Sequence, residues 1–326
     1  MIWIYFIAVA AVIVFAGAKL TVLAEKLAKL LNISSSVIGL LLVSIITSLP
    51  ELATSLSAVL KLGEPNLAVG NTLGSDLFNL MIIALCDVLL RRKGLLRGVA
   101  THIAPLLYYL FMLTVILLTL TLPNQIVILG AHFNIGSLLV IALYLFTFFK
   151  THRDGQLPVL EGTEPPDRSE LRKTAILFSI AAAAIVISGA LLAQLGDRIA
   201  EQTGLGHSFV GTLFLAIATS LPELTVSISA LRIGAVELML GNILGSNMFN
   251  VFISAIADLA YRKEAFHIPD SIAPGLLLIG GCSATMVCIA LLATRQKKKA
   301  HLLAWESVVM LGIYAAGLFA LYQISI

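Results

Sequence analysis

Two glutamates stand inside apolar stretches, at equivalent places in two copies of the motif TSLPEL. Glu51 follows Thr47 by four residues, and Glu223 follows Thr219 by four. This spacing places each carboxylate and its hydroxyl on one face of a helix. A carboxylate at the centre of a bilayer costs about 2.5–3.5 kcal/mol even on mild insertion scales, and no lysine or arginine lies at comparable depth. We therefore expect the partner of these carboxylates to be a mobile cation.

Each motif also carries a proline that loosens the helix before it. Pro50 has no N–H and pushes against the carbonyl four residues earlier, which frees carbonyls around 44–46. Pro222 does the same around 216–218. Carbonyls, hydroxyls and carboxylates are the oxygen ligands that suit Ca²⁺ and Na⁺. Two carboxylates would neutralise one divalent ion.

A second duplicated motif adds neutral oxygens: GNTLGSDLFN at 70–79 and GNILGSNMFN at 241–250. A single Asn or Ser in a span usually makes a hydrogen bond between helices, but exact duplication beside two glutamates favours ion binding. Asp76 stands where the other copy has Asn247, and it is a candidate third carboxylate. The polar residues that step by four in this layer are Asn71, Ser75, Asn79, Asn242, Ser246 and Asn250.

The composition requires lipid as the solvent. Of the 326 residues, 59% are hydrophobic and 12% charged, with a mean hydropathy of +1.00. A soluble domain has about 45–50% apolar and about 25% charged residues. Long apolar runs indicate helices of roughly 20 residues rather than barrel strands. We expect an all-α membrane protein with ten transmembrane helices. The basic residues lie in short loops, so no nucleic-acid partner is expected.

The longest polar segment, 150–173, divides the spans five and five. The predicted parts are therefore 1–149, a linker at 150–173, and 174–326. The predicted spans are 2–18, 36–60, 66–90, 99–121, 126–149, 174–195, 208–231, 236–260, 270–293 and 304–325.

The distribution of lysine and arginine predicts the orientation. Loops after the odd-numbered spans hold 17 of these residues and the opposite side holds 4. Basic residues accumulate on the cytoplasmic side of a membrane. We expect a multi-pass protein of the cell membrane with both termini outside and the 150–173 linker cytoplasmic.

The two copies of the pattern form an inverted repeat. Residues 39–55 match 211–227 at 10 of 17 places, and the second motif matches at 7 of 10. The copies begin at spans 2 and 7, five spans apart, so the second copy is upside down in the membrane. Inverted repeats with interrupted helices are typical of transporters whose site lies at the repeat interface near the midplane. Duplication for architecture alone would preserve small and apolar positions, whereas the best match here is polar.

The paired motifs resemble the two α-repeats of the Ca²⁺/cation antiporter superfamily, most closely its prokaryotic sodium/calcium exchanger branch. The repeats correspond to 36–79 and 207–250. The resemblance implies two inverted five-helix halves, four ion sites between spans 2, 3, 7 and 8, and spans 1 and 6 sliding as a gate. It also implies exchange of about three Na⁺ for one Ca²⁺.

Carried over by motif position, the resemblance assigns a ligand set. Glu51 and Glu223 are the expected Ca²⁺ ligands. Hydroxyl or backbone oxygens near them come from Thr47, Ser48, Thr219, Ser220, Ser44 and Ala216, and the flanking Na⁺ sites are completed by Ser75, Asn79, Ser246 and Asn250.

The leading hypothesis is a Na⁺/Ca²⁺ antiporter that works by alternating access, without covalent chemistry, cofactor or protein partner, and so not an enzyme. One alternative is Ca²⁺/H⁺ or other cation/H⁺ exchange, with Glu51, Glu223 or Asp76 taking protons. A cation channel also uses carboxylates and carbonyls, but paired inverted halves favour a carrier. An intramembrane protease is disfavoured because no aspartate pair or Ser/His dyad accompanies the repeats.

Overall fold

The computed structural model describes residues 1–89, 102–121, 125–128, 131–154, 167–202, 216–261, 273–294 and 305–325. Within these residues the chain is helical apart from one pair of short strands. The elements are α1 (Ile2–Leu31), α2 (Ser35–Val37), η1 (Ile38–Val43), α3 (Ser44–Thr47), α4 (Leu49–Ser57), η2 (Ala58–Leu62), α5 (Pro65–Leu89), α7 (Ile103–Thr121), β1 (Gln125–Ile128), β2 (Ala131–Asn134), α8 (Ile135–Asp154), α9 (Arg168–Gln202), α11 (Leu221–Arg232), α12 (Val236–Ala260), α13 (Ala273–Thr294) and α14 (Trp305–Ser325).

Eight helices in the described part of the chain are long and apolar enough to cross a membrane. They confirm eight of the ten predicted spans as candidates. The fourth predicted span is a shorter apolar helix, Ile103–Thr119. The seventh, 208–231, is described only from residue 216, as a helical segment at 216–219 followed by α11. The candidate spans are Ile2–Leu31, Ser35–Leu62, Pro65–Val88, Ile135–Arg153, Arg168–Gly196, Val236–Ala260, Ala273–Thr294 and Trp305–Ile324.

The predicted start of the fifth span at 126 was wrong. Residues there form β1, which pairs antiparallel with β2 so that Gln125 faces Asn134 and Ile128 faces Ala131. The helix α8 begins only at Ile135. The β-branched run at 126–128 favours a strand, yet to a hydropathy count it looks like the continuation of an apolar helix. In the described residues these two four-residue strands are the only departure from the expected all-helical fold.

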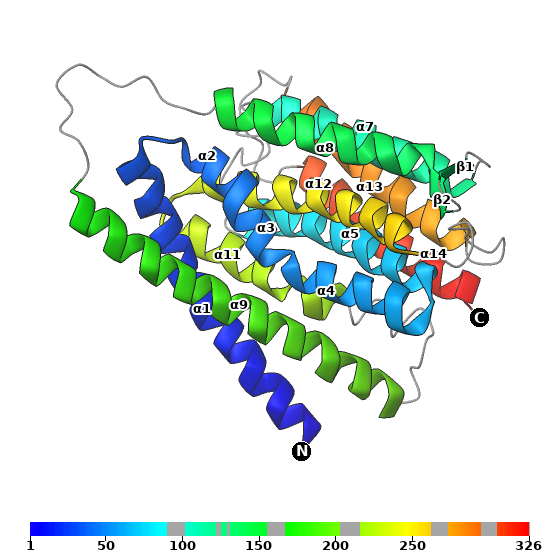
Figure 1. Ribbon diagram of the computed structural model, residues 1–326, viewed down its shortest axis with the longest axis horizontal. Helices are drawn as coiled ribbons and strands as arrows, with labels where there is room; N and C mark the ends of the chain where they lie inside the picture. Colours follow the sequence, from blue (N-terminus) through cyan, green and yellow to red (C-terminus); the bar gives the residue numbers. More distant parts are fainter. Residues whose placement is uncertain are drawn as a thin grey trace.

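The helices α1 and α9 are longer than the predicted spans 2–18 and 174–195. They pack against each other along one flank of the molecule, where Figure 1 shows them side by side. The amino group of Lys26, near the end of α1, lies 2.8 Å from a carboxylate oxygen of Glu170, near the start of α9. Such charged extensions reach beyond the apolar part of each helix. Helices α8 and α9 also extend into the predicted linker, whose residues 155–166 lie outside the described ranges.

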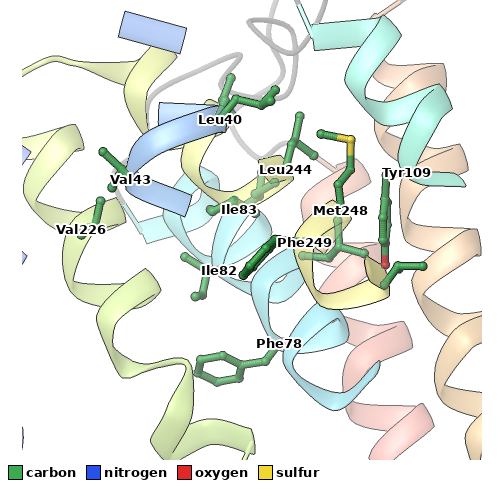
Figure 2. Packing of buried hydrophobic residues seen from close by; sticks show 14 of the residues in the cluster. Leu40, Val43, Phe78, Ile82, Ile83, Tyr109, Val226, Leu244, Met248 and Phe249 are labelled. Atoms are coloured by element: carbon green, nitrogen blue, oxygen red, sulfur yellow. The ribbon is translucent and has the colours of Figure 1, made fainter. Parts of the chain in front are cut away.

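The helices α5 and α12 form the centre of the bundle. In an apolar 18-residue stretch of each helix, 83% of the residues are buried in α5 and 78% in α12, against 28% in α1. Figure 2 shows side chains from η1, α5, α7, α11 and α12 meeting in one cluster, among them Val43, Ile83, Tyr109, Val226 and Leu244. The outer helices expose large apolar side chains, as expected for surfaces that contact lipid.

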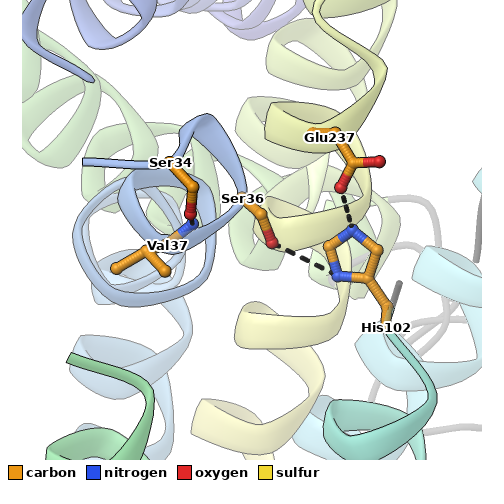
Figure 3. Close-up of polar contacts among 5 residues, drawn as sticks. All are labelled: Ser34, Ser36, Val37, His102 and Glu237. Atoms are coloured by element: carbon orange, nitrogen blue, oxygen red, sulfur yellow. Dashed lines mark hydrogen bonds and ion pairs between the residues drawn. The ribbon is translucent and has the colours of Figure 1, made fainter. Parts of the chain in front are cut away.

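Polar residues at the ends of the helices join elements that are distant in sequence. His102, immediately before α7, places Nε2 2.8 Å from Oε2 of Glu237 at the start of α12, and Nδ1 3.4 Å from the Ser36 hydroxyl of α2 (Figure 3). The hydroxyl of Ser307 donates to Asp87 at 2.6 Å, joining the start of α14 to the end of α5. Each of these contacts joins helix ends that the predicted topology places on the same side.

Candidate ion-binding site

The two TSLPEL motifs interrupt their helices at the same point. Ser48, between α3 and α4, has φ −94° and ψ 7°, and Ser220, before α11, has φ −85° and ψ 8°. A proline follows two residues later in each motif and occupies the first turn of the new helix, where its missing N–H is least costly. The expected interruption is therefore present in both copies. Glu51 and Glu223 each lie in the first turn of the new helix, where the helix dipole favours a negative charge.

Each carboxylate accepts a hydrogen bond from the interrupted helix of the other copy. The hydroxyl of Ser48 donates to Oε1 of Glu223 at 2.8 Å, and that of Ser220 donates to Oε1 of Glu51 at 3.3 Å. All four residues are fully buried. The second oxygen of each glutamate, Oε2, has no hydrogen-bond partner. The two contacts are related by exchange of the motifs.

The threonines of the two motifs face the interrupted backbone. Thr47 Oγ1 lies 3.2 Å from the carbonyl oxygen of Ser44, and Thr219 Oγ1 lies 3.1 Å from that of Ala216. The same hydroxyls also approach the second motif of the opposite copy. Thr47 lies 3.3 Å from Oδ1 of Asn242, and Thr219 lies 3.4 Å from Oδ1 of Asn71. Since each hydroxyl has one proton, its lone pairs remain available to another group.

The predicted Na⁺ ligands lie in the same buried layer, but the two copies are not identical there. Ser246 donates to Oε1 of Glu223 at 3.2 Å and lies 3.5 Å from the carbonyl oxygen of Ser44. Ser75, its counterpart, has a hydroxyl without a partner. The amide oxygens of Asn79 and Asn250 are likewise unpartnered.

Unpartnered buried oxygens gather among the predicted ligands. A buried acceptor without a partner costs about 1–3 kcal/mol, and a hard cation would coordinate such oxygens. All twelve predicted ligand residues are at most 1% exposed. The unpartnered oxygens of this set are Oε2 of Glu51, Oε2 of Glu223, Oγ of Ser75, Oδ1 of Asn79 and Oδ1 of Asn250.

The charge of the site comes from carboxylates alone. Within the described ranges, no ion pair involves Glu51 or Glu223. In the same residues no group of three or more His, Cys, Asp or Glu side chains forms a metal cluster. Two carboxylates and many neutral oxygens suit Ca²⁺ or Na⁺ better than a transition metal, which favours nitrogen and sulfur ligands.

Sequence reasoning missed Tyr109 of α7. Its hydroxyl donates to Oδ2 of Asp76 at 3.1 Å, and the residue is fully buried beside the second motif. Tyr109 stands in an ordinary apolar run, LLYYLF, outside both duplicated motifs. Neither spacing nor duplication marks it, so only the folded structure, in which α7 packs against α12 and Tyr109 reaches Asp76 of α5, reveals the contact.

The fold and the site together define a multi-pass membrane protein with a buried, negatively charged, oxygen-lined site between two related motifs. A profile of the family described as sodium/calcium exchanger protein matches residues 1–162 and 173–323. The chain therefore belongs to the sodium/calcium exchanger protein family. It is a transporter of the cation/Ca²⁺ antiporter class rather than an enzyme.

Several proteins are similar over most of the chain. The sodium/calcium exchanger MaX1 of Methanosarcina acetivorans is 28% identical over 92% of this chain and 93% of its own. The inner membrane protein YrbG of Escherichia coli is 28% identical over 77% of this chain and 80% of its own. A structure of the sodium-calcium exchanger NCX_Mj, soaked with 10 mM Na⁺ and zero Ca²⁺, has a TM-score of 0.71 at 20% identity, over 98% of this chain and 99% of that one. This last likeness concerns the fold.

Proposed function

We propose that the protein is a secondary active antiporter that exchanges Na⁺ for Ca²⁺ by alternating access, with Ca²⁺ held between Glu51 and Glu223. The observation that carries this proposal is the reciprocal pair of contacts from Ser48 to Glu223 and from Ser220 to Glu51. These contacts bring two buried carboxylates from opposite copies to one place. Their free Oε2 atoms are available to a cation.

The charge of the site explains why the two ions compete. Two buried carboxylates are costly without positive charge beside them, so the protein switches access from one side to the other most readily when the site is loaded. One Ca²⁺ neutralises the pair, and so do two Na⁺. The Na⁺ ions would be held with the help of the neutral oxygens of Ser75, Asn79, Ser246 and Asn250. From the family resemblance we expect an exchange ratio of about three Na⁺ per Ca²⁺.

The arrangement of the outer helices supports alternating access. Helix α1 of the first half packs on α11 of the second, and α9 of the second half packs on α4 of the first. Gly189 of α9 sits directly on Pro50, where an added Cβ would lie 2.3 Å from Cγ of the proline. Gly17 of α1 sits in the same way on Thr225. We propose that α1 and α9 move together over the two interrupted helices and open the site to one side at a time.

We propose a topology of ten helices in two inverted halves, with the basic loops cytoplasmic and both termini outside. The contacts between Lys26 and Glu170 and between His102 and Glu237 support it. Each contact joins two helix ends next to loops that come after odd-numbered spans. This topology places all of these loops on one side of the membrane. The excess of lysine and arginine in those loops supports their cytoplasmic location.

The proposal is tested by ⁴⁵Ca²⁺ uptake into proteoliposomes preloaded with either Na⁺ or K⁺. Uptake should require internal Na⁺ and be lost in Glu51→Gln and in Glu223→Gln. Glu64→Gln, which changes an exposed carboxylate in the same way, is the matched control and should behave as wild type. Equal uptake with internal K⁺ would contradict sodium coupling, and uptake that follows an imposed pH gradient would favour proton exchange instead.

A further inference from the structure

Asp76 makes three hydrogen bonds in the buried second layer, although it is absent from the predicted ligand set. Its Oδ1 accepts from Nδ2 of Asn250 at 3.0 Å, and its Oδ2 accepts from the hydroxyl of Tyr109 at 3.1 Å. Its backbone carbonyl accepts from Nδ2 of Asn247 at 3.3 Å. Asp76 and Asn247 hold equivalent places in the two copies, so these contacts link the halves.

The carboxylate of Asp76 determines which way the amide of Asn250 points. A carboxyl oxygen that carries no proton can only accept hydrogen bonds, whereas an amide has one accepting and one donating end. Asn250 must therefore turn its NH₂ group toward Asp76. Its oxygen then has no hydrogen-bond partner although the residue is fully buried, and it is left for a cation.

The backbone carbonyl of Asp76 determines the orientation of the Asn79 side chain through Asn247. Because the carbonyl of Asp76 can only accept, Asn247 must present its NH₂ group there. The oxygen of Asn247 then accepts from Nδ2 of Asn79 at 3.0 Å. This contact turns the oxygen of Asn79 away, and that atom is also buried and unpartnered. One residue therefore sets both amides, with the same 3.0 Å contact in each half.

We propose that Asp76 is a positioning residue that holds the side-chain oxygens of Asn79 and Asn250 toward the transported ions, with Asn247 as its counterpart in the second half. This inference rests on the proposed function, because those two oxygens are its expected Na⁺ ligands. Asp76 acts through the asparagines and does not itself contact the ion.

The asymmetry between Asp76 and Asn247 follows from Tyr109. This tyrosine reaches the second motif from α7 and belongs to the packed cluster of Figure 2. Asp76 therefore has two side-chain partners, and a carboxylate obliges both to donate. An amide at position 76 can keep the contact to Asn250 only in one of its two orientations, with its own NH₂ directed at the tyrosine oxygen.

The test compares Asp76→Ala with Asp76→Asn in the uptake assay, as the internal Na⁺ concentration is varied. Asp76→Ala should raise the Na⁺ concentration for half-maximal exchange by about tenfold, with a maximal rate within about twofold of wild type, because one ligand is misoriented. Asp76→Asn retains an acceptor for Asn250 and should stay within about threefold of wild type.

A double mutant separates positioning from general damage. If Asp76 acts through Asn250, adding Asp76→Ala to the Asn250→Ala variant should raise the Na⁺ concentration for half-maximal exchange by less than about twofold. Should Asp76→Ala not purify as a folded species, Asn247→Ala decides the question, since it frees the amide of Asn79 and should shift Na⁺ dependence in the same direction.

Three results would overturn the inference: unchanged Na⁺ dependence in Asp76→Ala, full additivity with Asn250→Ala, or equal damage in Asp76→Asn and Asp76→Ala. Equal damage would show that charge rather than orientation matters. Absence of Na⁺-dependent uptake in the wild-type protein would instead contradict the proposed function on which the inference rests. The two failures are therefore distinguishable.

Discussion

The hydroxyl of Ser48 donates a 2.8 Å hydrogen bond to Oε1 of Glu223, so the first motif directly contacts the carboxylate of the second. The converse contact, from Ser220 to Glu51, is 3.3 Å long. Neither glutamate is therefore positioned by its own half alone. Any movement of one interrupted helix relative to the other must change the surroundings of both carboxylates.

Removal of either hydroxyl should weaken Ca²⁺ binding to a similar degree. A hydrogen bond to a charged group contributes about 1.5–3 kcal/mol, so Ser48→Ala and Ser220→Ala should each lower apparent Ca²⁺ affinity by about tenfold or more. Half-saturation in the uptake assay measures this. Ser179→Ala, on an exposed face of α9, is the control. Loss of affinity in one serine variant only would contradict the reciprocal arrangement.

Calcium should stabilise the folded protein through the two glutamates. A ligand present at about 100 times its Kd stabilises by about 2.7 kcal/mol, which should raise the Tm of the purified protein by several degrees. Glu51→Gln and Glu223→Gln should lose this rise. Their ion-free Tm should equal or exceed that of wild type, because a buried carboxylate without a cation is costly. An undiminished Ca²⁺-induced rise in both variants would place the ion elsewhere.

A side chain at Gly189 should slow exchange more than it weakens Ca²⁺ binding. Gly189→Val would place atoms against Pro50, where an added Cβ already lies at 2.3 Å. Overpacking of this kind costs about 1–3 kcal/mol, so we expect the maximal exchange rate to fall by about tenfold. Gly281→Val in α13, where no atom lies within 4 Å of an added Cβ, should leave the rate unchanged. Equal rates for the two variants would argue against movement of α9 over Pro50.

Acid should destabilise the protein in part through His102. Burial lowers the pKa of His102 below its usual 6.5, and the nearby carboxylate of Glu237 opposes this shift only in part. The unfolded chain therefore binds this proton more readily, and stability is lost as the pH falls from 6.5 through the pKa of the folded state. Thermal unfolding at about pH 7.5 and about pH 5 measures the loss.

His102→Gln should show a smaller fall in Tm over this interval than wild type. His152→Gln, near the end of α8, changes an exposed histidine and should keep the wild-type dependence. The same pH dependence in wild type and His102→Gln would show that other groups govern acid stability.

Most of the helices could be predicted from hydropathy, but their ends could not. Charges such as Lys19 and Lys26 mark the end of an apolar run, yet α1 continues to Leu31. The continuation is stabilised by packing on α9 and by the pairing of Lys26 with Glu170, which no local pattern reveals. The strand at 125–128 is apolar enough to resemble part of a transmembrane helix. Its antiparallel pairing with β2 is a contact that composition does not reveal.

The candidate site could be predicted as a set of residues, but not as a set of contacts. Duplication identified Glu51 and Glu223, and helical spacing placed Thr47 on the face of Glu51. The sequence could not show that each serine serves the glutamate of the other half, because sequence separations of 175 and 169 residues lie between the partners. The link from Asp76 to Tyr109 could not be predicted either, because Tyr109 lies outside both duplicated motifs.

Equilibrium binding of ⁴⁵Ca²⁺ to the purified protein would show whether one Ca²⁺ binds between Glu51 and Glu223. We expect one Ca²⁺ per chain, displaced by Na⁺, and no specific binding in either Glu51→Gln or Glu223→Gln. Specific binding with wild-type affinity in either variant would place the ion elsewhere.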